Sequence, residues 1–227
     1  MAALSYQLGA RAAGPIIRSM EETLTAEELP DRSPYRQPDG SSWPVPPPDG
    51  YTVDDFFTLD LPPHTELIDG SLVFVSPQRA FHTLSMCLLE QGLRQHLPSG
   101  LRVRREMAMV LGKRNVPEPD VVVVTAEAVG SQRQNRYQAA DVLLAVEVVS
   151  PDSEDRDRDT KPHKYAAAGI KHFWLVEMTG ERDRPMVITY ELDPVNKTYV
   201  STGVHHDRLK LSAPYDIDID LTAIDEL

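Results

Sequence analysis

PEPDVVVV at residues 117–124 and VLLAVEVV at residues 142–149 decide the fold of this chain. Each contains a run rich in Val or Leu without polar alternation, which is typical of a central β-strand covered on both faces. Each also carries one carboxylate beside or within the run, Asp120 or Glu147. An ionised carboxylate in such a place is costly unless a counter-charge or a metal offsets its desolvation. The two acids are therefore the first candidates for a functional site.

The segments around these two strands predict a mixed α/β core. Asp69-Gly70 predicts the turn of a hairpin over 66–75, and Gly169 predicts the end of a helix over 160–168. The remaining expected elements are a short helix over 52–59 with a capping-box-like start, a long helix over 78–97, strands over 101–111 and 172–177, and a hairpin of 186–192 with 197–202. Several links are too short for crossovers, so several neighbouring strands must be antiparallel.

The composition divides the chain into three parts. Residues 1–50 are rich in proline, with seven prolines between Pro30 and Pro48, and we expect a largely irregular N-terminal extension. Residues 51–210 are expected to form the folded domain. Residues 211–227, in which acids alternate with apolar residues, are expected to form an acidic tail or an edge strand.

The net charge of −12 limits the possible functions. A protein that coats a nucleic-acid duplex would be basic, because much of its affinity comes from neutralising phosphates. An acidic chain can still act on a phosphodiester if it brings a divalent cation to a small acidic pocket, but it then needs a local basic surface. Eight residues are candidates for that surface, and by default they belong to solvated faces. They are Arg94, Arg102, Arg104, Arg105, Lys113 and Arg114, and separately Arg133 and Arg136.

The cysteine count and the hydropathy pattern exclude further classes. Cys87 is the only cysteine, which rules out an intrachain disulfide and a tetrathiolate zinc site. The chain has no apolar stretch near the roughly 20 residues that a membrane span needs, and its N-terminus lacks the pattern of a signal peptide. We therefore expect a cytoplasmic protein without a membrane partner.

The pair of acids suggests a nuclease-like arrangement. Such a site needs two carboxylates that hold a hard divalent cation, and a lysine whose charge opposes the negative charge that grows in the transition state. Position 149, on the same strand face as Glu147, would suit that lysine but is valine. Lys161, in the first turn of the next helix, could return to the strand end where Glu147 lies.

Five stretches in this order carry a family resemblance. They are TELIDG at 65–70 with SP at 76–77, PDV at 119–121, EVVSP at 147–151, DRDTK at 157–161 followed by Tyr165-Ala166 and Gly169, and FWLV at 173–176. Over roughly residues 51–210 the chain resembles the Uma-two family of endonucleases, a branch of the PD-(D/E)XK nuclease superfamily. The resemblance implies a restriction-endonuclease-like mixed β-sheet core flanked by helices, with an added N-terminal hairpin and a C-terminal hairpin.

The resemblance also implies a metal site. Asp120 and Glu147 would hold Mg²⁺ or Mn²⁺, and the main-chain carbonyl of Val148 would add a third ligand.

Four further side chains complete the implied site. Lys161 would be the displaced catalytic lysine, and Glu66 an outer carboxylate of the catalytic site. His82 and Tyr165 would be accessory residues, with Tyr165 orienting the lysine. Pro162 departs from the family pattern, because it directly follows the lysine and could shift it.

The resulting expectation is a Mg²⁺-dependent endonuclease that hydrolyses nucleic acid, DNA in particular, with a metal-activated water, and that acts as a homodimer. The alternative is a non-catalytic interaction or regulatory module on a nuclease-like scaffold, which the net charge of −12 favours somewhat. A third option is a hydrolase of a small phosphorylated molecule. Arg102, Arg104 and Lys113 near Asp120 would favour nucleic acid over the other two.

Overall fold

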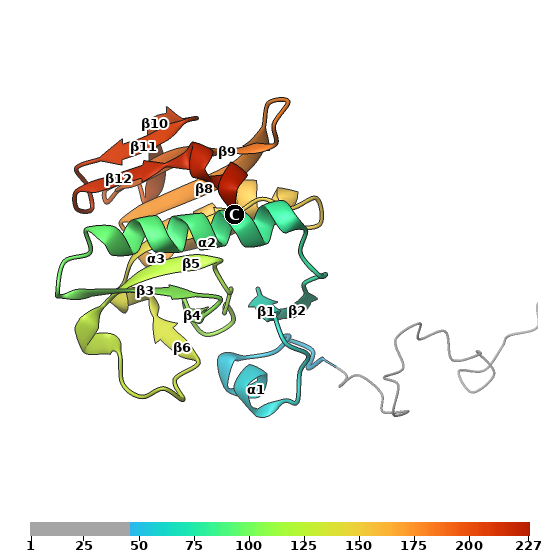
Figure 1. The fold of residues 1–227 in the computed structure, drawn as a ribbon. Helices are drawn as coiled ribbons and strands as arrows, with labels where there is room; N and C mark the ends of the chain where they lie inside the picture. Colours follow the sequence, from blue (N-terminus) through green and yellow to red (C-terminus); the bar gives the residue numbers. More distant parts are fainter. Residues whose placement is uncertain (1–45) are drawn as a thin grey trace, which may run out of the picture. The chain divides into compact units, whose positions relative to one another are not determined.

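Six strands pair into one mixed sheet in this computed structural model, which describes residues 46–227 (Figure 1). The sheet order is β10-β9-β8-β7-β5-β3. The strands are β3 (Leu101–Arg105), β5 (Val121–Thr125), β7 (Val142–Val148), β8 (His172–Thr179), β9 (Arg184–Asp193) and β10 (Thr198–His205). Within this sheet only β7 and β8 are parallel. The mixed α/β fold expected from the sequence is confirmed. The expected Pro-rich extension lies outside the described residues, apart from 46–50.

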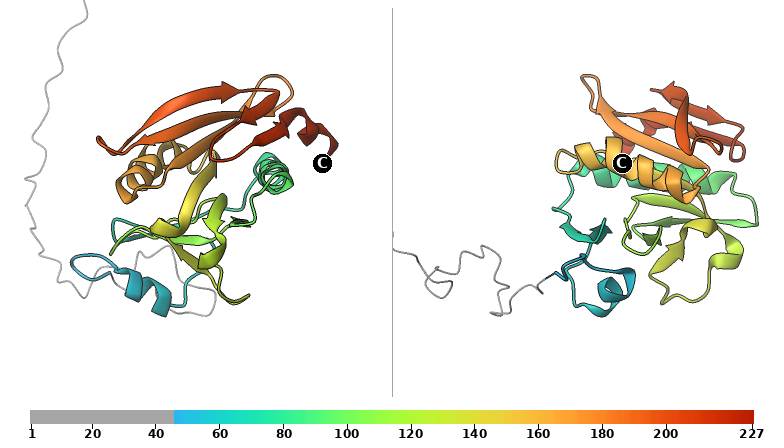
Figure 2. Two further views of the ribbon diagram at one scale, coloured as in Figure 1. Left: turned by 90° about the vertical axis from the view of Figure 1, so that its left-hand side faces the viewer. Right: turned by 180° about the vertical axis from the view of Figure 1, so that it is seen from behind.

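The two apolar stretches form β5 and β7, which are neighbours near the middle of the sheet. Val121 and Val123 pack in the cluster that includes α2 (Ala80–Gln95), whereas Val122 and Val124 pack in the cluster that includes Tyr165 of α3 (Lys161–Ala168). The left view of Figure 2 shows α2 and α3 on opposite faces of the sheet. Burial on both faces explains why these strands lack polar alternation. No helix within residues 46–227 is long and apolar enough to cross a membrane.

A separate hairpin of β1 (Thr65–Ile68) and β2 (Ser71–Phe74) forms where Asp69-Gly70 predicts it. Both turn residues have a positive φ, 51° and 82°, as a two-residue hairpin turn requires. The hairpin packs with α1 (Val53–Thr58), which begins with the expected capping box of Thr52 and Asp55. This small layer brings Glu66 to the side of the main sheet.

Two expected elements differ in detail. The strand expected over 101–111 is interrupted at Glu106, whose φ is 50°, so that β4 (Ala108–Val110) leaves the sheet and pairs with β6 (Arg136–Gln138). The charged loop expected before α3 contains a π-helical turn, Arg156–Thr160, that runs directly into the helix. Gly169 ends α3 with a φ of 86°, as expected.

Residues 211–227 contribute to the core. β12 (Ile217–Asp220) pairs with β11 (Arg208–Leu211), and a 3₁₀ helix, Leu221–Glu226, follows. Ile217 and Ile219 are buried in the same cluster as α2, whereas Asp218 between them is half-buried and Asp220 after them is exposed. The expected boundary at residue 210 falls inside β11.

The packing of this hairpin on α2 gives a first prediction. A Cβ atom added at Gly92 of α2 would lie 2.5 Å from Ile219 Cγ1. Gly92→Ala should therefore lower the free energy of unfolding by about 1–3 kcal/mol through overpacking, although helix propensity alone would raise it by about 1 kcal/mol. Urea unfolding measures the difference, with Gly100→Ala as control because a Cβ there meets open space. A more stable Gly92→Ala variant would contradict the packing.

Candidate active site

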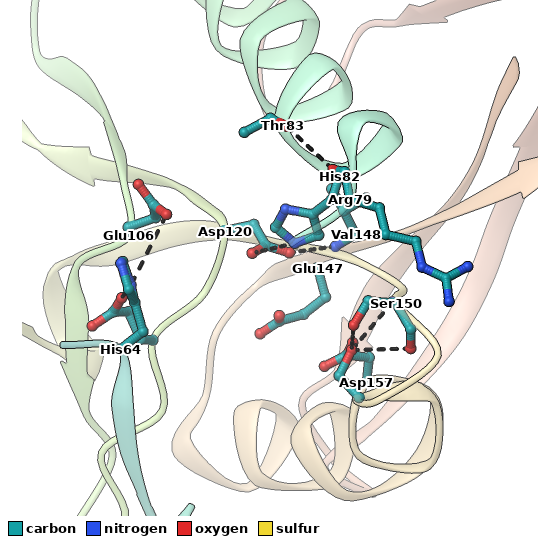
Figure 3. Close-up of polar contacts among 12 residues, drawn as sticks. His64, Arg79, His82, Thr83, Glu106, Asp120, Glu147, Val148, Ser150 and Asp157 are labelled. Carbon is teal, nitrogen blue, oxygen red and sulfur yellow. Dashed lines mark hydrogen bonds and ion pairs between the residues drawn. The ribbon is translucent and has the colours of Figure 1, made fainter. Parts of the chain in front are cut away.

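Among the charged side chains that line one pocket of about 350 Å³, five from separate parts of the fold include the predicted site residues. Asp120 immediately precedes β5 and Glu147 lies in β7, while Glu66 comes from β1. Asp157 lies in the π-helical turn and Lys161 begins α3. Figure 3 shows Asp120, Glu147 and Asp157 close together at the end of the sheet. The fold therefore gathers side chains that are almost 100 positions apart in the sequence.

Lys161 lies at the centre of this group. Its Nζ is 3.0 Å from Glu66 Oε1, 3.0 Å from Glu147 Oε2 and 3.2 Å from Asp157 Oδ1. The first turn of α3 thus returns to Glu147, and Pro162 does not prevent this. Burial lowers the pKa of Lys161, but the surrounding carboxylates outweigh it and hold the pKa well above its usual range. Lys161 is therefore an ammonium ion.

Asp120 is held from two sides. Its Oδ1 lies 2.9 Å from His82 Nε2, and its Oδ2 accepts a hydrogen bond of 2.6 Å from the Val148 N–H. His82, expected as an accessory residue, therefore contacts the aspartate directly. Val148 contacts Asp120 through its N–H, and its carbonyl as a metal ligand stays a prediction.

Glu147 is completely buried and bridges two residues of α3. Its Oε2 contacts Lys161, and its Oε1 accepts a hydrogen bond from the Tyr165 hydroxyl. Tyr165 thus holds Glu147, the partner of the lysine, and its role of orienting Lys161 stays a prediction. Burial raises the pKa of Glu147 well above its usual range, and Lys161 opposes this effect. Burial also raises the pKa of Tyr165, which keeps its hydroxyl a donor.

Asp157 is a site residue that the sequence analysis missed. It is buried, accepts a hydrogen bond from the Ser153 hydroxyl, and lies four residues before Lys161. The spacing of four residues was the available signal, because it places two side chains on the same helical face. This spacing was not used, because residues 152–159 were expected to form a charged loop and not a helical turn.

The negative charge of the site exceeds its positive charge. Six carboxylates and one ammonium ion line the pocket, and Glu66 Oε2 is buried without a hydrogen-bond partner in the described residues. Carboxylate oxygens and excess negative charge fit a hard divalent cation in chemistry and in charge. Within residues 46–227, however, no three His, Cys, Asp or Glu side chains are arranged to hold a metal ion. Glu66, Glu147 and Asp157 surround the ammonium group of Lys161. This group therefore lies between the carboxylates where a metal cation would otherwise lie.

The three basic residues that would favour nucleic acid lie outside the pocket. Arg102, Arg104 and Lys113 do not line the pocket. Arg102 and Arg104 flank the buried Val103 on β3 and so point to the opposite face of that strand, where their guanidinium groups donate to nearby main-chain carbonyls. These three side chains therefore do not form a basic strip inside the pocket.

Comparison with known proteins gives the family. The model of the Uma2 (Uma-two) family, described as "Putative restriction endonuclease", matches residues 53–223. A crystal structure described as "a putative nuclease" from Anabaena variabilis superposes with a TM-score of 0.60, with 15% sequence identity over 78% of this chain and 98% of that chain. A search of curated proteins found no match. The family match spans both carboxylate strands, Lys161 and the C-terminal hairpin, and this chain therefore belongs to the Uma2 family.

Proposed function

We propose that this protein is a metal-dependent endonuclease that hydrolyses phosphodiester bonds in nucleic acid. The observation that supports it most is the meeting of Asp120, Glu147 and Lys161 in one pocket, from three separate elements, in a chain of the Uma2 family. Two carboxylates and a lysine at one point are the groups that this reaction requires.

Each residue has a part in this proposal. Asp120 and Glu147, with the carbonyl of Val148, would hold Mg²⁺ or Mn²⁺. When bound, the cation would offset phosphate charge and acidify a water molecule. Lys161 opposes the charge that grows on the phosphate.

The remaining side chains of the site support these groups. His82 keeps Asp120 in place, and Tyr165 does the same for Glu147. Glu66 completes the outer part of the site through its contact with Lys161.

Titration with Mn²⁺ followed by calorimetry tests the metal site directly. The wild type should bind, and Asp120→Asn and Glu147→Gln should each weaken binding by more than the roughly 10–100-fold that loss of an outer-shell partner costs, because each removes a charged ligand. Asp159→Asn is the matched control, since Asp159 is a largely exposed acid in the same turn that faces His163. Equal binding by all four proteins would contradict the assignment of the ligands.

We further propose that the substrate is DNA and that the protein acts as a homodimer in the cytoplasm. The family description supports DNA, and analogy with nucleases that cut as symmetric pairs supports the dimer. Cleavage of plasmid DNA compared with an RNA transcript tests the substrate, and light scattering coupled to gel filtration tests the dimer.

A second candidate function is a non-catalytic interaction or regulatory module. It is favoured by the ammonium of Lys161, which already compensates part of the carboxylate charge, and by the absence of the basic strip from the pocket. A wild type that neither binds Mn²⁺ nor cleaves nucleic acid would favour this candidate.

A further inference from the structure

A histidine–carboxylate pair lies in the same pocket, beside the metal-site acids. His64 Nδ1 is 2.6 Å from Glu118 Oε1 and 4.0 Å from Glu106 Oε1. All three residues line the pocket, and Figure 3 shows His64 and Glu106 on the β1 side of Asp120 and Glu147. The His64 side chain is 52% exposed, whereas that of Glu118 is only 19% exposed. His64 is therefore the member of the pair that a substrate can reach.

The pair is fixed to the centre of the site through the main chain. The Glu118 N–H donates a hydrogen bond of 2.8 Å to Glu66 Oε1, the same oxygen that contacts Lys161. His64 directly precedes β1, the strand that carries Glu66. The position of the imidazole is thus set by the elements that position Lys161 and its carboxylates.

The contacts of His64 leave one ring nitrogen available. Glu118 engages Nδ1, and Nε2 has no partner within the described part of the chain. A carboxylate on one ring nitrogen fixes the tautomer and the ring orientation, so that the other nitrogen can serve a ligand. The hydrogen bond to Glu118 also raises the pKa of His64, which favours the protonated ring.

The imidazole of His64 could bind a phosphate group or donate a proton, and the carboxylates of Glu118 and Glu106 favour one of these roles. An anchor for a phosphate group needs net positive charge, and Glu118 and Glu106 together more than cancel the charge of an imidazolium ion. A proton donor needs only a free N–H in a fixed position. The surroundings of His64 therefore favour proton transfer over phosphate binding.

We propose that His64, positioned by Glu118, donates a proton to the leaving oxygen of the phosphodiester. This inference rests on the proposed function. A water molecule gives a hydroxyl group to phosphorus and releases its other proton to solvent. The P–O ester bond breaks, its electron pair stays on the leaving oxygen, and that oxygen takes the Nε2 proton. The imidazole then regains a proton from solvent, and the products are a phosphomonoester and an alcohol.

The test varies the leaving group. Single-turnover cleavage of plasmid DNA, whose leaving group is an alkoxide, is compared with hydrolysis of bis(p-nitrophenyl) phosphate, whose leaving phenolate needs no proton. His64→Asn should slow cleavage of DNA by about 10²-fold, which is typical of a lost general acid, and should leave hydrolysis of the p-nitrophenyl ester essentially unchanged. Glu118→Gln should show the same selectivity with a smaller loss. His163→Asn, an exposed histidine outside this pocket, is the control and should match the wild type on both substrates.

Two results would overturn the role of His64. Equal losses on both substrates would indicate that the side chain only supports the structure, and no loss on either would remove it from the reaction. If His64→Asn lowers the melting temperature, His64→Gln is measured in its place. A wild type that hydrolyses neither substrate would instead refute the proposed function and this inference with it, so the two failures are distinguishable.

Discussion

Replacement of Lys161 by methionine should lower the free energy of unfolding by about 3–5 kcal/mol, the cost of removing one partner from a buried ion pair. Methionine has a similar length and no charge. Glu66, Glu147 and Asp157 would then face one another without the cation that lies between them. Both Glu66 and Glu147 are about 1% exposed, so water cannot replace the lost charge.

The measurement is urea unfolding, first with EDTA and then, after removal of the chelator, with Mn²⁺. Lys164→Met is the matched control in the same helix, because Lys164 pairs at 2.6 Å with Asp69, whose side chain is 70% exposed. The Lys164 side chain is 17% exposed, but a pair whose acid is this exposed is well screened and should contribute only about 1 kcal/mol. Mn²⁺ should restore part of the stability of Lys161→Met, since a cation that binds only the folded state stabilises it. Similar small losses in both variants would contradict a charged cluster around Lys161.

Much of the fold was predictable from the sequence because its signals are local. Asp69-Gly70 fixes a tight turn through its positive φ angles, and Gly169 ends a helix in the same way. The apolar runs of β5 and β7 indicate strands buried on both faces. A helix that packs back onto the sheet was expected to return Lys161 to the strand end where Glu147 lies, and the family resemblance then implied its role as the catalytic lysine.

The parts that were not predictable depend on tertiary packing. The alternation in 216–221 correctly indicates one buried face, but it does not say that α2 covers this face. The charges of 152–159 read as solvated, and only the π-helical turn brings Asp157 into the pocket. No sequence pattern indicated His64 as a site residue, because its partner Glu118 lies 54 positions away in the sequence.

The second large effect is expected for Glu147→Gln, which should reduce Mg²⁺-dependent cleavage of plasmid DNA by about 10³-fold, because it removes a charge on which the transition state depends. The cost in stability should be much smaller than for Lys161→Met. Burial already raises the pKa of Glu147, which means that an uncharged group is tolerated at this position. Lys161 also keeps Glu66 and Asp157 as partners when Glu147 is neutral.

The two measurements together separate catalysis from folding. Glu147→Gln should unfold close to the wild-type midpoint and cleave DNA far more slowly, whereas Asp159→Asn should match the wild type in both. If Glu147→Gln keeps its activity, the proposed mechanism is wrong, whatever its stability. If it loses activity and stability in parallel, Glu147 is primarily a structural partner of Lys161 and Tyr165. A catalytic role for Glu147 predicts a large loss of activity together with a small loss of stability. No other combination of the two results is expected for a buried carboxylate whose main role is catalysis.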